Sequence, residues 1–152
     1  MIGDVTFKKT TWAELPFKFE AGTPDYVGIS AFKTALDYID RIGIDAIEAH
    51  EERLLEYTQG EMMKMDGIRI FGTAQGKSPV ISFLTGDAHP YDTGMLLDKL
   101  GVAVRTGHHC AQPLMAALGV EGVVRASFGM YNTLEECEAF LAALRRVTAM
   151  LG

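Results

Sequence analysis

One short segment concentrates the residue types that could do chemistry. It reads Arg105-Thr106-Gly107-His108-His109-Cys110-Ala111-Gln112-Pro113. We expect residues 106–109 to form a loop that leads into a short helix from Cys110 to Leu118. A helix N-terminus and nearby cationic side chains both favour the thiolate, which is the nucleophilic form of cysteine. Arg105, His108 and His109 can supply positive potential, so Cys110 is a candidate nucleophile.

Other interpretations of this segment need to be weighed. Most cysteines are small buried hydrophobes, and Cys137, which lies in the apolar stripe of the last expected helix, fits that description. Cys110 has polar and cationic neighbours, but local chemistry alone leaves its role open. His108, His109 and Cys110 do not predict a metal site, because adjacent residues rarely all face one ion and no second ligand cluster has structural-zinc spacing.

Arg125 is the second candidate, because it lies among apolar residues in the expected strand Val123 to Phe128. A buried arginine needs a partner, and a planar carboxylate matches the fork of its guanidinium group. That carboxylate could belong to an Asp or Glu of this chain or to a substrate. The residues alone do not decide between the two.

Hydrophobic periodicity, glycines and prolines indicate the elements that position these residues. The first 22 residues are expected to be an extended arm. Helices are expected at Tyr26–Ile42, Asp45–Met65, Pro90–Gly101, Cys110–Leu118 and Leu134–Leu151, and strands at Gly67–Phe71, Pro79–Thr85, Val102–Arg105 and Val123–Phe128. The resulting order predicts a small α+β layer, with a mixed or antiparallel sheet and helices packed on one face.

Composition limits the function classes. The chain has 152 residues, 48% of them hydrophobic and 22% charged, which indicates a globular protein with a hydrophobic core. A net charge of -6 argues against binding nucleic acid or an anionic membrane surface. We expect no membrane span and no signal peptide. The cytoplasm is therefore the expected location, and two cysteines are too few for a disulfide framework.

Three segments together carry a family resemblance. Arg105 to Leu114 resembles the active-cysteine segment of group II cysteine desulfurases and selenocysteine lyases. Phe19 to Pro24, and Val124 to Ser127 followed by Tyr131 to Thr133, resemble two further hallmark segments in the same order. These enzymes belong to the class V aminotransferase superfamily, fold type I of the pyridoxal 5'-phosphate (PLP) enzymes.

The resemblance implies a role for individual residues. Cys110 corresponds to the nucleophile that takes sulfur from a PLP-bound substrate and becomes a persulfide. Arg125 corresponds to the arginine that grips the substrate carboxylate, while Arg105 and His108 line the same pocket. Gly22 and Thr23 correspond to a turn that reaches the cofactor phosphate of the partner subunit in the family's homodimer.

In one respect the chain departs from the pattern of this family. The family holds PLP on a lysine that follows a histidine in its large domain, and none of the lysines at 8, 9, 18, 33, 64, 77 and 99 has that context. The expected division is therefore residues 1–42, an arm and helix from the end of the missing large domain, and residues 43–152, the small C-terminal domain with the cysteine loop.

The complete enzyme implied by this resemblance acts on L-cysteine or selenocysteine. It leaves alanine and passes sulfur to an acceptor protein for iron–sulfur cluster assembly, and we expect the fragment alone to be inactive. Two alternatives stay open: a standalone sulfur-carrier or docking module, and another class V enzyme such as an aminotransferase. The cysteine loop argues against the latter, because simple transamination does not need a thiol there.

Overall fold

The computed structural model describes all 152 residues, in two compact units, Met1–Gly43 and Ile44–Gly152. The first unit opens with an antiparallel hairpin, β1 (Ile2–Val5) and β2 (Thr10–Trp12), followed by a 3-10 helix, η1 (Phe17–Phe19). The arm expected over the first 22 residues thus contains a hairpin of extended strands and one short 3-10 helix.

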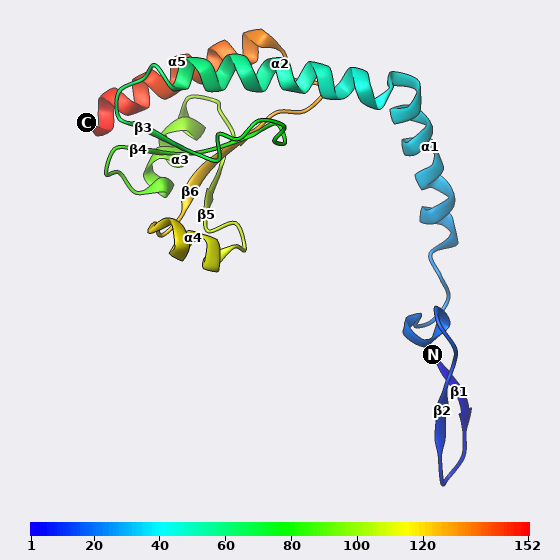
Figure 1. Cartoon of the computed structure of the whole chain (residues 1–152). Helices are drawn as coiled ribbons and strands as arrows, with labels where there is room; N and C mark the ends of the chain where they lie inside the picture. Colours follow the sequence, from blue (N-terminus) through cyan, green and yellow to red (C-terminus); the bar gives the residue numbers. More distant parts are fainter. The chain divides into compact units, whose positions relative to one another are not determined.

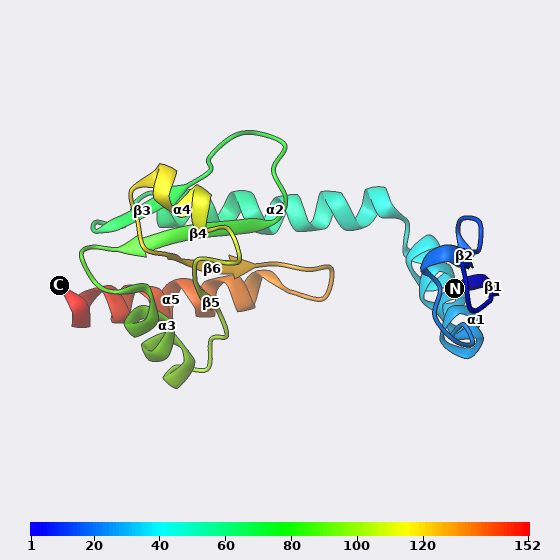
Figure 2. The ribbon, with the colours of Figure 1, turned by 90° about the horizontal axis from the view of Figure 1, so that it is seen from below.

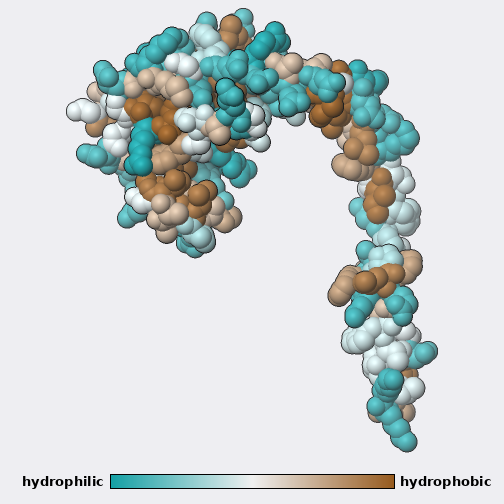
Figure 3. All heavy atoms as spheres, in the orientation of Figure 1, coloured by the Kyte–Doolittle hydropathy of each residue, from teal (hydrophilic) through white to brown (hydrophobic).

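Helix α1 (Tyr26–Ile42) completes the first unit and has the predicted bounds. The Asp25 side chain caps it by accepting a hydrogen bond from the Gly28 amide, and it ends at Gly43, whose φ of 88° favours glycine. Large apolar side chains line the helix but stay exposed, including those of Ile29, Phe32 and Leu36. Figure 3 shows hydrophobic side chains gathered along α1. No residue of this unit is buried, so its apolar stripe lacks a partner within the unit.

The second unit is built on a four-stranded antiparallel sheet with the strand order β3-β4-β6-β5. The strands are β3 (Ile68–Phe71), β4 (Val80–Thr85), β5 (Arg105–Gly107) and β6 (Val123–Ser127). Side chains alternate between the two faces of a strand, and Ile81, Phe83, Val124 and Ala126 form the buried face. Figures 1 and 2 show this sheet from two directions.

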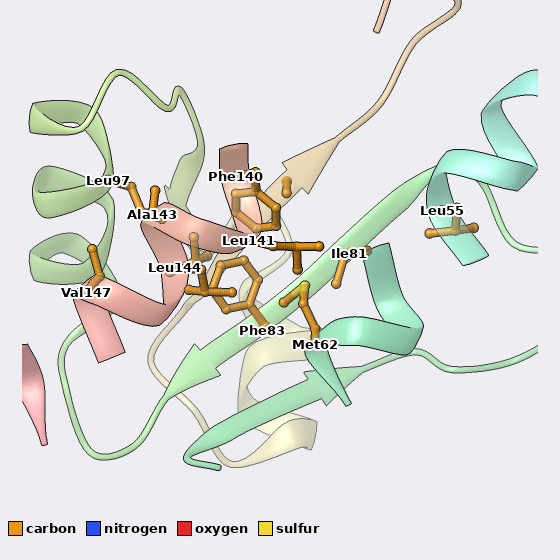
Figure 4. Close-up of a cluster of buried hydrophobic side chains, with 12 residues drawn as sticks. Leu55, Met62, Ile81, Phe83, Leu97, Phe140, Leu141, Ala143, Leu144 and Val147 are labelled. Carbon is orange, nitrogen blue, oxygen red and sulfur yellow. The ribbon is translucent and has the colours of Figure 1, made fainter. Parts of the chain in front are cut away.

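Helices α2 (Ile44–Met62), α3 (Pro90–Lys99) and α5 (Leu134–Leu151) pack on the buried face of this sheet. Figure 4 shows the core that they enclose, in which Phe83 packs edge-on against Phe140 with ring centroids 6.2 Å apart. The Thr133 and Glu136 capping box precedes α5 as predicted. These features confirm an α+β fold with helices on one face of an antiparallel sheet. None of the helices combines the length and apolar run needed to cross a membrane.

Two predicted boundaries next to the cysteine are wrong. The strand expected at Val102–Arg105 lies instead at Arg105–Gly107, because Val102 and Val104 pack against the core while the Val102 amide bonds to the Leu97 carbonyl at the end of α3. Helix α4 spans Gln112–Leu118 rather than starting at Cys110. Cys110 has a φ of 57°, which excludes it from a right-handed helix.

Candidate functional site

Cys110 lies in a tight loop between β5 and α4, and its side chain is exposed. His109 and Cys110 have φ angles of 52° and 57°, the only positive values outside glycine in the chain. The Cys110 amide donates to His108 Nδ1 over 3.1 Å, and the Ala111 amide donates to the His108 carbonyl over 2.9 Å. The loop therefore presents the thiol on a sharply turned backbone rather than from a helix N-terminus.

Three close contacts fix the strand that carries this loop. A Cβ at Gly94 of α3 would collide with the Thr106 methyl group, so glycine lets α3 approach β5. A Cβ at Gly122 would lie 2.8 Å from the Gly107 carbonyl carbon, so the two backbones touch where β5 ends. The ring Nε2 of His109 lies 3.1 Å from the carbonyl oxygen of Val123.

A row of polar side chains crosses the sheet beside the loop. Strand register pairs Arg125 of β6 with Ser82 of β4 on one side and with Arg105 of β5 on the other. Directly paired residues of antiparallel strands point to the same face, and here that is the face opposite the hydrophobic core. The register thus places Arg105 directly opposite Arg125, a position in which like charges repel.

The Arg125 side chain lacks a partner within the chain. Its Nε atom is buried and makes no hydrogen bond. The salt bridges of the structure join Lys33 with Asp37, and Glu61 with Lys64 and Arg145, so Arg125 takes part in none. A buried donor without an acceptor is costly, and a carboxylate or another small anion could supply the acceptor that the Arg125 Nε atom lacks.

The remaining sequence candidates lie elsewhere. Gly22, with a φ of 74°, and Thr23 form an exposed turn in the first unit, before α1. No heavy atom lies within 4 Å of a Cβ built on Gly22, so the turn is open on that side. Cys137 lies inside the second unit, where burial raises the pKa of its thiol and disfavours the nucleophilic thiolate.

Sequence reasoning missed two contributors to this site. Ser82 occupies an outward position in an otherwise apolar strand, and the alternation of β4 could have singled it out. The contact between Gly107 and Gly122 joins residues that are distant in sequence, so no local pattern could have indicated it.

Comparisons with known proteins agree with this architecture. The sequence profile of the family described as "Aminotransferase class-V" matches residues 1–140. A probable cysteine desulfurase of Xylella fastidiosa (strain 9a5c) is 47% identical over the whole chain, which covers 36% of that protein. A cysteine desulfurase of Salmonella agona (strain SL483) is 45% identical, again over the whole chain and 37% of the relative. The chain thus spans a little over a third of the length of these relatives.

Solved structures show the same likeness. The cysteine desulfurase CsdA of Escherichia coli superposes with a TM-score of 0.87 and 35% sequence identity, over 99% of this chain and 37% of that one. The apo cysteine desulfurase of Thermococcus onnurineus NA1 gives a TM-score of 0.86 and 37% identity, over 98% of this chain and 38% of that one.

Proposed function

We propose that this chain, which belongs to the class V aminotransferase family, is the C-terminal part of a PLP-dependent cysteine desulfurase in which Cys110 accepts the sulfur. One observation carries the proposal: an exposed cysteine follows strand β5, whose neighbour β6 carries a half-buried arginine with a buried and unpartnered Nε atom. Sulfur removal from an amino acid needs a nucleophile for the sulfur and an anchor for the substrate carboxylate.

Arg125 is the carboxylate anchor in this proposal. A substrate carboxylate would supply the acceptor that the buried Nε lacks, and a charge-assisted hydrogen bond of this kind contributes about 1.5–3 kcal/mol. Arg105, opposite Arg125 in the strand register, adds positive charge and stays exposed. His108 belongs to the same site in this proposal, and its ring Nδ1 accepts a hydrogen bond from the Cys110 amide.

Cys110 takes the sulfur atom itself. A bond forms between its Sγ and the sulfur of L-cysteine while the carbon–sulfur bond of the substrate breaks. The products are L-alanine and a persulfide on Cys110, so the atoms balance and no external oxidant or reductant is consumed. An exposed thiol suits the next step, in which the terminal sulfur passes to a thiol of an acceptor protein for iron–sulfur cluster assembly.

Class V aminotransferases and cysteine desulfurases depend on PLP, which when bound supplies an electron sink for cleavage of the carbon–sulfur bond. The unpaired Arg125 Nε supports a role for this chain on the anionic substrate side of such a site. The open turn at Gly22 and Thr23 offers backbone and hydroxyl donors to the phosphate of the partner subunit's cofactor. The lysine that carries the cofactor belongs, in this proposal, to the remainder of a longer protein.

We extend the proposal to the domain division, location and oligomeric state of the protein. Residues 1–42 form the end of the large domain, and the uncovered apolar stripe of α1 supports this because it needs a partner surface. Residues 43–152 form the small domain. The complete protein is a cytoplasmic homodimer that uses L-cysteine or selenocysteine, and the fragment alone is inactive.

A standalone sulfur-carrier module is the second candidate. The observation in its favour is that the unit Ile44–Gly152 has its own hydrophobic core and still exposes Cys110. Such a module would accept a persulfide sulfur from another protein without cleaving a carbon–sulfur bond.

Alanine formation separates the two candidates. The complete protein and the 152-residue chain would each be incubated with PLP and L-cysteine, with a Cys110→Ser variant of the complete protein as the comparison and Cys137→Ser as its matched control. We expect alanine from the complete protein and its Cys137→Ser variant only. Turnover by the 152-residue chain, or undiminished turnover by Cys110→Ser, would overturn the proposal.

A further inference from the structure

The backbone around Cys110 adopts a conformation that its residue types do not favour. Two successive residues, His109 and Cys110, have φ angles of 52° and 57°. Side chains with a Cβ are disfavoured in this left-handed region, and such residues persist only where the surroundings hold them. The loop therefore needs an anchor outside itself.

The contacts of the loop identify that anchor. Regular pairing between β5 and β6 reaches no further than Gly107 opposite Val123. Beyond this pair, the bonds of His108 to Cys110 and to Ala111 stay within the loop. The bond from His109 to the Val123 carbonyl is the one hydrogen bond that joins residues 108–111 to β6.

The chemistry of this bond fixes its direction. A carbonyl oxygen can only accept, so His109 Nε2 must carry the hydrogen and donate it over 3.1 Å. His109 is half-buried and Val123 is 2% exposed, which shields the bond from water.

We propose that His109 is a positioning residue, whose hydrogen bond to the Val123 carbonyl holds Cys110 in its left-handed conformation and so sets the direction from which Sγ meets the substrate sulfur. His109 does not itself touch the reacting atoms. This inference rests on the proposed function, because it assigns His109 a part in the sulfur transfer to Cys110. A misplacement of about 1 Å in such a geometry can cost on the order of 100-fold in rate.

Two substitutions of His109 test the bond in the complete protein loaded with PLP. His109→Leu removes the donor, whereas His109→Gln keeps an amide N–H at the corresponding distance from the backbone. The matched control is His50→Leu, because His50 Nε2 makes the same type of bond to a backbone carbonyl, that of Asn132 at 2.9 Å, away from the cysteine loop.

Two measurements are made on each variant. Hydrogen exchange of the peptide that spans residues 106–125 reports how firmly the loop is held, with or without substrate. Single-turnover persulfide formation on Cys110, together with the KM for L-cysteine, reports the chemistry. We expect His109→Leu to speed exchange of the loop amides and to slow persulfide formation about 10- to 100-fold with little change in KM. His109→Gln should keep most of the protection of the loop amides and most of the rate of persulfide formation. His50→Leu should leave loop exchange and that rate unchanged.

The opposite results would overturn the inference. Unchanged loop exchange in His109→Leu would show that the bond is not the anchor. Faster exchange with an unchanged rate, equal slowing by His50→Leu, or no recovery in His109→Gln would show that the anchor does not position the thiol. If the unaltered protein forms alanine without sulfur on Cys110, the proposed function fails instead, and the exchange measurement still decides whether His109 holds the loop.

Discussion

Replacement of Arg125 by methionine should separate function from stability. The structure leaves the Arg125 Nε atom buried without an acceptor, and an unsatisfied buried donor costs about 1–3 kcal/mol. Methionine keeps an unbranched apolar chain of similar reach and removes that donor. We therefore expect Arg125→Met to leave the thermal unfolding midpoint of the substrate-free protein unchanged or to raise it.

Substrate binding should respond in the opposite direction. Loss of a charge-assisted hydrogen bond to the substrate carboxylate removes about 1.5–3 kcal/mol, which corresponds to a fall of about 10- to 150-fold in kcat/KM at 1.4 kcal/mol per factor of ten. The fall should appear mainly in the KM for L-cysteine. Arg125→Lys keeps the charge but not the fork of the guanidinium group. Its kcat/KM should therefore lie between that of the unaltered protein and that of Arg125→Met.

The assay is steady-state alanine formation by the complete protein, paired with thermal unfolding of the same samples. Arg145→Met is the matched control, because Arg145 is exposed and its salt bridge with Glu61 spans 3.4 Å on the surface. That variant should change neither measurement by much. A large fall in the unfolding midpoint of Arg125→Met with an unchanged KM would refute the reasoning, since Arg125 would then be a structural partner of a carboxylate within the protein.

Three further outcomes are expected. Phe83→Ala should lower the free energy of unfolding by about 3–5 kcal/mol in urea titration, because Phe83 is fully buried against Phe140; a loss below about 1 kcal/mol would contradict the core described here. Iodoacetamide at neutral pH should modify the exposed Cys110 and spare Cys137, whose pKa burial raises; mass spectrometry showing equal labelling of both would contradict this. Hydrogen bonds from the Asn132 side chain and, to a lesser extent, the Thr133 backbone hold the pKa of Glu136 below its ordinary value of 4.5. The ionised Glu136 carboxylate therefore stabilises the folded protein above pH 4.5, and this stabilisation is lost as the pH falls through the lowered pKa. The urea midpoint of Glu136→Gln should therefore fall less than that of the unaltered protein on acidification from neutral pH, and identical curves would contradict the assignment.

Local patterns were sufficient to predict the bounds of α1 and α5. The apolar stripe and the terminal glycine gave α1 its bounds at Tyr26 and Ile42, and the Thr133 capping box marked the start of α5 at Leu134. Both features depend on residues within a few positions of each other, so they can be read from the sequence.

The bounds of the elements next to Cys110 were predicted less accurately, because these elements depend on contacts with residues distant in sequence. Val102 and Val104 alternate like a strand but pack under the end of α3, while the pairing of Arg105 with Arg125 decides where β5 lies. The left-handed turn at Cys110 has no signal in its residue types. Residue chemistry could single out Cys110 and Arg125 as candidates, but the neighbours that complete the site come from tertiary contacts.

Trypsin offers a direct test of sulfur on Cys110. Cleavage after Arg105 and Arg125 releases the peptide Thr106–Arg125, which contains Cys110 and not Cys137. After a single turnover of the PLP-loaded complete protein with L-cysteine, we expect this peptide to gain the mass of one sulfur atom, in proportion to the alanine formed, and to lose it on reduction. Alanine formed while this peptide stays unmodified, or sulfur found on the Cys137 peptide, would contradict the assignment of Cys110 as the sulfur acceptor.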